Sequence, residues 1–253
     1  MKQDIYDDPI FFEGYRNLRR TESGLNAAIE DPAVASVLPD LGGLEILDLG
    51  SGFGDFCRWA RKNGAAKVVG VELSERMITE AGQRTSDPRI SYVQAAMEDF
   101  SIGPKAYDVI VSRMALHYVS DYRGMVGSIY RGLRGGGVFV FSVEHPICTA
   151  LCRGWHEDAE GKPLFWPVDD YGREGERRHH WFVAGVIKYH RTVETYVNTL
   201  LDAGFGLARL LEPQVSGPWR ERRPDLMDSA RRPPVLVVAA KKPAGPVPGS
   251  PAT

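Results

Sequence analysis

The feature that most constrains the fold of this chain is a short, mostly apolar segment that runs into closely spaced glycines. Residues 44–49 have the sequence LEILDL, and Gly50, Gly52 and Gly54 follow directly in the segment GSGFG. Glycines at this spacing let the backbone turn tightly and approach a ligand closely, and the next helix can offer its free N–H groups. The pattern predicts a strand, a loop and a helix that together bind a nucleotide-like cofactor.

Strands and helices are expected to alternate along much of the remaining chain. The expected strands cover residues 44–49, 67–72, 89–94, 107–112, 138–143, 205–211 and 235–240. The expected helices end near residues 63, 84, 134 and 203, with Ser74 and Thr192 as N-caps of the second and fourth and the glycines 135–137 ending the third. Near-continuous apolar strands that alternate with helices are typical of a parallel sheet covered on both faces. The pattern therefore predicts an α/β fold with seven strands.

Two segments lie outside this alternation. Residues 1–40 have helical spacing of apolar side chains and predict an N-terminal helical cap. Residues 145–190 hold five of the six histidines and many aromatic side chains, namely Trp155, Phe165, Trp166, Tyr171, Trp181 and Tyr189. A loop of this length inside a compact domain usually has a function, so a lid and an acceptor-binding pocket are expected here. Residues 1–242 then form a single domain, and residues 243–253 form a disordered tail.

The composition excludes several classes of protein. Of the 253 residues, 43% are hydrophobic and 25% are charged, which is ordinary for a soluble globular protein and excludes a disordered chain. Three cysteines do not make a disulfide scaffold, and a formal charge of −2 gives no general attraction to nucleic acid or anionic membranes. No apolar run is long enough to span a bilayer, and the first twenty residues lack the basic and then apolar pattern of a signal peptide, so we expect neither feature. We therefore expect a cytoplasmic monomer or homodimer with no nucleic-acid or membrane partner.

A carboxylate at the end of the second expected strand points to an adenosine-containing cofactor. Glu72 follows Gly50 by 22 residues, and a carboxylate at this place can accept hydrogen bonds from both ribose hydroxyls. The dinucleotide-binding fingerprint requires a glycine at position 55, where this chain has Asp55. A nicotinamide cofactor is thereby disfavoured, and a nicotinamide-dependent dehydrogenase is kept as an alternative.

In these residues the chain resembles the class I S-adenosylmethionine-dependent methyltransferases of the small-molecule type. Residues 48–54 are similar to the first motif of this family and residues 69–74 (VGVELS) to the second, and the resemblance extends over residues 40–145. It implies a Rossmann-like sheet, mostly parallel with an antiparallel closing strand, and a lid inserted after the fifth strand. It also implies S-adenosylmethionine as cofactor and S-adenosylhomocysteine as product. The implied reaction transfers a methyl group to N, O or C of a small-molecule acceptor by in-line displacement. The aromatic side chains of residues 145–190 could stack on an aromatic or apolar acceptor.

The resemblance also assigns residues to the cofactor. These residues are Asp48, Gly50, Ser51, Gly52, Glu72, Leu73, Ala96, Met97, Glu98 and Ser112. The glycine loop is assigned to the methionine part, Glu72 to the ribose and Leu73 to the adenine. Many relatives have an aspartate for the adenine amino group where this chain has Ala96, so Glu98 or the backbone would replace it. Tyr15 and Arg19 are expected to close over the cofactor carboxylate, unless they belong to an amphipathic surface helix.

Three side chains near the carboxyl ends of the fourth and fifth strands are candidates for catalysis. His145 follows the fifth strand, and ligands of open α/β sheets bind at this edge. Its ordinary pKa is near neutral, so it is the first candidate for a general base, if the acceptor needs one. Glu144 and His117 are expected at the same edge. For both histidines the alternative is a structural hydrogen bond to the backbone.

Other interpretations stay open at this point. Cys148, Cys152 and His156, with His179 or His180, could supply metal ligands, but their spacing matches no common zinc site, so we expect no metal. Within the same fold, an enzyme could displace the cofactor's own side chain and release methylthioadenosine. A non-catalytic protein that binds S-adenosylmethionine is a further alternative.

Overall fold

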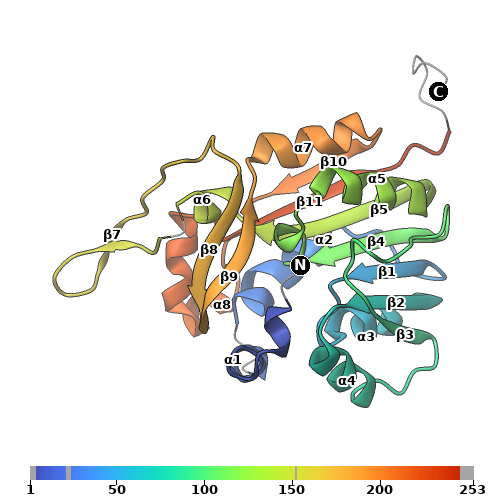
Figure 1. The fold of residues 1–253 in the computed structure, drawn as a ribbon, viewed down its shortest axis with the longest axis horizontal. Helices are drawn as coiled ribbons and strands as arrows, with labels where there is room; N and C mark the ends of the chain where they lie inside the picture. The colour runs from blue at the N-terminus through green and yellow to red at the C-terminus, as the bar shows by residue number, and fades with distance from the viewer. Residues whose placement is uncertain (1–3, 21–23, 152, 246–253) are drawn as a thin grey trace.

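The computed structural model describes residues 4–20, 24–151 and 153–245, without the side chains of residues 19 and 20, and has a seven-stranded sheet at its centre (Figure 1). The strands lie in the order β10-β11-β5-β4-β1-β2-β3. They are β1 (Glu45–Leu49), β2 (Lys67–Glu72), β3 (Ile90–Gln94), β4 (Tyr107–Arg113), β5 (Leu133–Glu144), β10 (Gly206–Leu211) and β11 (Val235–Lys241). Strand β11 is antiparallel to both neighbours, and the other pairs are parallel. The predicted Rossmann-like sheet with an antiparallel closing strand is confirmed.

Helices cover both faces of the sheet, as the apolar strands predict. One core lies between the sheet and the helices α5 (Tyr122–Gly132) and α7 (Val193–Asp202), and a second lies against α2 (Asp31–Val37) and α3 (Asp55–Lys62). Strand β1 contributes Leu47 and Leu49 to the first core and Ile46 to the second. Because both faces of β1 are buried, its segment is mostly apolar rather than alternating.

The helix starts agree with the capping residues in the sequence. The side chain of Ser74 accepts a hydrogen bond from the Met77 N–H at the start of α4 (Glu75–Gln83), and Thr192 does the same for Thr195 at the start of α7. Such caps satisfy N–H groups that have no partner inside the helix. Both predicted N-caps are confirmed.

The predicted end of α5 is wrong. This helix ends at Gly132, and residues 135–137 lie inside β5, which already begins at Leu133. A Cβ on Gly137 would lie 2.9 Å from the carbonyl oxygen of Asp108 in β4. Gly137 therefore allows β4 to approach β5 closely, which is a common reason for glycine within a strand.

The N-terminal segment is helical and packs on the segment after β5. It comprises η1 (Ile5–Asp7), α1 (Pro9–Arg20) and η2 (Asn26–Glu30), followed by α2. The ring of Phe11 in α1 lies 5.2 Å from Trp181 and 5.5 Å from Phe182. Two segments far apart in the sequence thus meet beside the carboxyl edge of the sheet.

Residues 145–190 contain more regular structure than the expected loop. They hold α6 (Pro146–Thr149) and two hairpins, β6 (His156–Glu157) with β7 (Pro163–Phe165) and β8 (Gly175–Trp181) with β9 (Val183–His190). Strand β8 alternates between half-buried and exposed positions, but none of them is fully buried. Its sequence, GERRHHW, therefore lacks the alternation of apolar and polar side chains that predicts a strand. Phe182, at the turn, has a φ of +59° without being the usual glycine or asparagine.

Some expectations fall on residues that the structure does not describe. Cys152, the side chain of Arg19 and most of the predicted tail, residues 246–253, lie outside the described residues. Within the described part, no three His, Cys, Asp or Glu side chains are grouped as metal ligands would be. In the same part of the chain, no helix is long and apolar enough to cross a membrane.

Candidate active site

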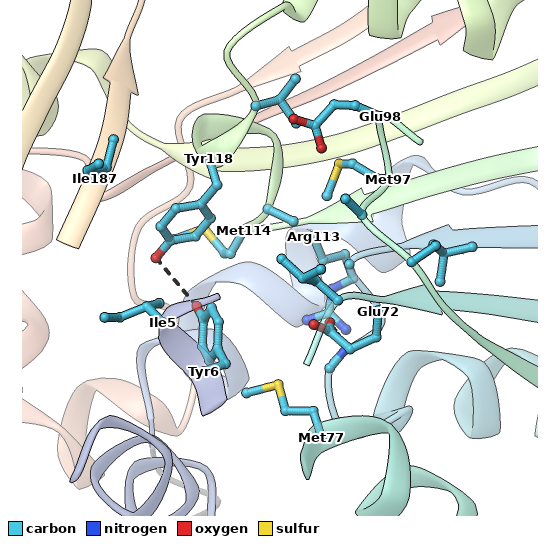
Figure 2. A pocket seen from close by; sticks show the side chains of 18 of the residues that line it. Ile5, Tyr6, Glu72, Met77, Met97, Glu98, Arg113, Met114, Tyr118 and Ile187 are labelled. Atoms are coloured by element: carbon cyan, nitrogen blue, oxygen red, sulfur yellow. Dashed lines mark hydrogen bonds between the residues drawn. The ribbon is translucent and has the colours of Figure 1, made fainter. Parts of the chain in front are cut away.

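A cavity of about 370 Å³ lies at the carboxyl ends of β1, β2 and β4 (Figure 2). Its walls come from the N-terminal segment, the glycine loop, the segments after β2 and β3, the turn η3 (Leu116–Tyr118) after β4, and β9. The residues that line it are Ile5, Tyr6, Tyr15, Gly50, Gly52, Val71, Glu72, Leu73, Met77, Ala95, Ala96, Met97, Glu98, Arg113, Met114, Ala115, Tyr118, Val119, Ser120, Ile187 and Tyr189. This is the edge where ligands bind in open α/β sheets.

The glycine loop forms the floor of the cavity with its backbone. The N–H groups of Gly50 and Ser51 both donate to the carbonyl of Val71, which ties the loop to β2. Gly50 has a φ of +79°, and a Cβ at this position would lie 2.5 Å from the Cβ of Ala115. Any other residue would therefore be strained and would push η3 away. The loop brings bare backbone to the cavity, as the sequence predicts.

Glu72 places a buried carboxylate at one end of the cavity. Only 8% of the residue is exposed, and its two oxygens accept hydrogen bonds from the N–H groups of Gly52 (2.9 Å) and Ser74 (3.0 Å). Burial raises the pKa of Glu72, and the two backbone donors oppose that rise. The carboxylate is thus fixed in orientation and keeps lone pairs for two further donors, as the hydroxyls of a ribose would require.

Most of the residues assigned to the cofactor line this cavity. They are Tyr15, Gly50, Gly52, Glu72, Leu73, Ala96, Met97 and Glu98. Asp48 lies under the loop instead, where its carboxylate accepts a hydrogen bond from the Cys57 thiol and burial raises its pKa to about 7. Ser112 donates to the carbonyl of Leu49, and the Ser51 hydroxyl lies against Gly70. None of these three residues is among the lining residues, so direct contact of their side chains with a cofactor stays a prediction.

The three catalytic candidates lie outside the lining of the cavity. His145 caps α6, since its Nδ1 accepts from the Ile147 N–H, and its Nε2 lies 2.8 Å from Glu212. His117 accepts a hydrogen bond from the backbone N–H of Glu144, and burial lowers its pKa to about 3. The Glu144 carboxylate is paired with Lys188 at 2.6 Å. Direct action of these three on an acceptor stays a prediction, and the structure gives each of them another partner.

Two tyrosines that were not predicted from the sequence face one another in the cavity. Tyr6 donates a hydrogen bond to the hydroxyl of Tyr118 at 3.4 Å, and Figure 2 shows the two rings between Ile187 and the Glu72 end. Tyr118 follows His117 in the turn after β4. This place at the ligand-binding edge of the sheet was the feature of the sequence that could have indicated its role. Of the aromatic residues expected to form the pocket after β5, only Tyr189 is among the lining residues described above.

Asp7 holds the N-terminal segment against the cavity. Its carboxylate accepts hydrogen bonds from the Ser74 hydroxyl (2.5 Å) and from the N–H groups of Arg76 (3.1 Å) and Glu75 (3.2 Å) at the start of α4. The preceding residues, Ile5 and Tyr6, form part of the cavity wall. One capping carboxylate thus links this wall to the helix that follows Glu72.

The charge of the cavity is negative. Among the described residues, the charged lining side chains are Glu72, Glu98 and Arg113. The Arg113 guanidinium binds both oxygens of the buried Glu30 and also contacts Asp31. Burial raises the pKa of Glu30, but Arg113 outweighs burial, so the pKa is lowered and the pair is ionised. Arg113 is therefore neutralised, and the cavity favours a cationic ligand.

Comparison with known proteins identifies the family. Residues 47–141 match the model of the methyltransferase domain family. The crystal structure of an S-adenosylmethionine-dependent methyltransferase from Mesorhizobium loti has 42% sequence identity and a TM-score of 0.79, covering 84% of this chain and 97% of that chain. The chain belongs to the S-adenosylmethionine-dependent methyltransferase family. A Listeria monocytogenes protein assigned to the same class has 43% identity and a TM-score of 0.80, over 84% and 96% of the two chains. An uncharacterized Haemophilus influenzae protein is 34% identical over 253 residues, 95% of this chain and 98% of its own.

This methyltransferase uses S-adenosylmethionine and releases S-adenosylhomocysteine. The cavity suits that cofactor in three respects: a bare glycine floor, a fixed carboxylate at Glu72, and a negative charge that matches a sulfonium. The methyltransferase relatives do not favour the nicotinamide alternative, nor the one that releases methylthioadenosine.

Proposed function

We propose that the enzyme transfers the methyl group to a small-molecule acceptor. This acceptor binds at the end of the cavity that is formed by η3 and β9. The observation that carries this proposal is the division of one cavity into two chemically different ends. The Glu72 end offers backbone and a carboxylate, while the other end is formed by Ile187, Tyr189 and the two facing tyrosines. The N-terminal segment and β9 both contribute to the walls, so the acceptor end is bounded by three separate parts of the chain.

We assign each lining residue to a part of the cofactor from its position in the cavity. Glu72 accepts the ribose hydroxyls, and the backbone of Gly50 and Gly52 holds the methionine part. The adenine lies against side chains from the ends of β2 and β3, which are Leu73, Ala96, Met97 and Glu98. Tyr15 closes the wall on the side of α1. Asp48, Ser51 and Ser112 support the loop from below, and the part of Arg19 stays a prediction.

The bound cofactor supplies a methyl group on a positively charged sulfur, which is already activated for displacement. The chain has to bind both reactants, align them and exclude water, and alignment alone can contribute several kcal/mol. Lys188 and Glu144 tie β9 to the end of β5, and this pair sets the position of Ile187 and Tyr189. His117 lies beside Tyr118, with ring centroids 4.5 Å apart, and supports that wall. We assign Lys188, Glu144 and His117 to positioning the acceptor wall.

The experiment follows the labelled methyl group. The protein is incubated with methyl-labelled S-adenosylmethionine and a cell extract that has been separated into a small-molecule filtrate and a macromolecular retentate. Label in products of the filtrate, with formation of S-adenosylhomocysteine, is the expected result. Label confined to protein or nucleic acid in the retentate would contradict the small-molecule proposal. A lack of turnover with both fractions, together with tight binding of S-adenosylhomocysteine, would favour the non-catalytic alternative.

A further inference from the structure

The acceptor end of the cavity can be separated from the cofactor end. Glu72 marks the ribose, and Figure 2 shows Tyr6 and Tyr118 between this residue and Ile187. Ile5 and Ile187 lie on the far side of the tyrosine pair from Glu72, and Met114 lies beside Tyr118 (Figure 2). Tyr189, two residues after Ile187 on β9, also lines the cavity. Aromatic faces and branched side chains make this end suited to a flat ring.

No charged side chain among the described lining residues belongs to this end. Two described cations near this end are paired with carboxylates, Arg113 with Glu30 and Lys188 with Glu144. Arg191 is buried behind the wall, where it donates to the carbonyls of Val119 and Ser120 and lies over the ring of Tyr189, and it is not among the lining residues. Lys188 lies between two lining residues of β9, but its amine is directed to Glu144. A phosphate or carboxylate on the acceptor would lose its water without gaining a counter-ion, which is unfavourable. The net negative charge of the cavity acts in the same direction.

Among the described lining residues, this end of the cavity also has no side chain that could act as a general base near neutral pH. Neither histidine nor lysine is among the lining residues described. Burial raises the pKa of Tyr118 and Tyr6, so both phenols keep their protons and act as hydrogen-bond donors. An alcohol, a phenol or a protonated amine would therefore arrive without a base to activate it. A ring nitrogen with a free lone pair needs none.

We infer that the acceptor is an uncharged heteroaromatic ring that is methylated on a ring nitrogen, with Tyr6 and Tyr118 donating hydrogen bonds to its polar edge. The 3.4 Å between the two hydroxyls exceeds the usual O–H···O distance, so both can turn toward a ligand. In the transfer, the nitrogen lone pair forms the N–C bond while the C–S bond breaks and its electrons stay on sulfur. The positive charge passes to the ring, which then releases its remaining N–H proton to water.

This inference rests on the proposed function, and its test separates the two. The protein is saturated with S-adenosylhomocysteine at neutral pH, and binding of three probes of similar size is measured by saturation-transfer NMR. The probes are benzimidazole, which is uncharged with a free ring nitrogen, benzoate, which is anionic, and catechol, which needs a base. Benzimidazole is expected to bind at least about tenfold more tightly than benzoate, and to yield methylated product with S-adenosylmethionine where catechol does not.

The variants Tyr6→Phe and Tyr118→Phe test the hydrogen bonds. Each is expected to weaken benzimidazole binding about three- to tenfold, as loss of one neutral hydrogen bond does. Tyr130→Phe is the matched control, because this tyrosine packs against Phe205 and is not a lining residue. Binding of benzoate as tight as that of benzimidazole, methylation of catechol alone, or no probe binding would overturn the inference. Failure of the wild type to bind S-adenosylhomocysteine would instead refute the proposed function.

Discussion

Replacement of Asp7 by alanine is expected to speed the release of S-adenosylhomocysteine. The substitution removes three hydrogen bonds to the start of α4, from Ser74, Glu75 and Arg76. A side chain that caps a helix in this way contributes about 1–2 kcal/mol, and a difference of that size changes an open fraction about 5–30-fold. Because Ile5 and Tyr6 form part of the cavity wall, loosening the N-terminal segment is expected to open a path for the ligand.

The assay is stopped-flow displacement of bound S-adenosylhomocysteine, which gives the dissociation rate directly. Burial raises the pKa of Asp7, but its hydrogen bonds outweigh burial and lower it, so the contact is complete at neutral pH and is lost only as acid protonates the carboxylate. The dissociation rate is therefore measured at neutral pH.

Asp8→Ala provides the matched control. Asp8 caps α1 through the N–H groups of Ile10 and Phe11 and has no hydrogen bond to α4. Asp8→Ala should lower the free energy of unfolding by about as much as Asp7→Ala does, but leave the dissociation rate unchanged. An unchanged rate in Asp7→Ala, or equal acceleration in both variants, would refute the account of Asp7.

Three further substitutions give distinct results. Gly50→Ala should abolish binding of S-adenosylhomocysteine by calorimetry, whereas Gly52→Ala should only weaken it, because its added Cβ has no neighbour nearer than 3.8 Å; equal affinities would contradict this role of the loop. Lys188→Met should lower the free energy of unfolding by about 1–3 kcal/mol, since it removes the partner of the half-buried Glu144 carboxylate. Glu144→Gln in the same chain should restore much of this loss, as measured by chemical denaturation. The stability of Asp48→Asn relative to the wild type should increase as pH rises from 3.8 to about 7. The reason is that burial raises the pKa of Asp48 in the folded state, so its ionisation destabilises only the folded wild type. A difference in melting temperature between the two proteins that stays constant over this pH range would contradict the prediction.

The parts of the fold that depend on residues close together in the sequence could be predicted from it. The glycine loop, Glu72 and the caps at Ser74 and Thr192 follow from patterns within a few residues. The β8–β9 hairpin could not be predicted, since β8 buries neither face fully and its turn contains Phe182 rather than glycine. Tyr6 reaches the cavity through contacts between Asp7 and Ser74, residues 67 apart in the sequence, which no local pattern reveals.

The position of His145 was predictable but its orientation was not. It follows β5 at the expected edge of the sheet. Pro146 begins α6, however, and proline is favoured at the first position of a helix, so His145 becomes the N-cap. Its ring then serves the helix and Glu212 rather than the cavity. A histidine followed by proline was the signal for this structural role.

The affinity of Glu72→Ala for S-adenosylhomocysteine tests the central claim most directly. Isothermal titration calorimetry of the wild type, Glu72→Ala and the control Glu75→Gln gives three dissociation constants; Glu75 is exposed at the start of α4 and is not a lining residue. Loss of charge-assisted hydrogen bonds to the ribose costs about 1.5–3 kcal/mol, so the Kd of Glu72→Ala should rise about 10–150-fold. The control should keep the wild-type value. A Kd of Glu72→Ala equal to that of the control would contradict the placement of the cofactor in this cavity.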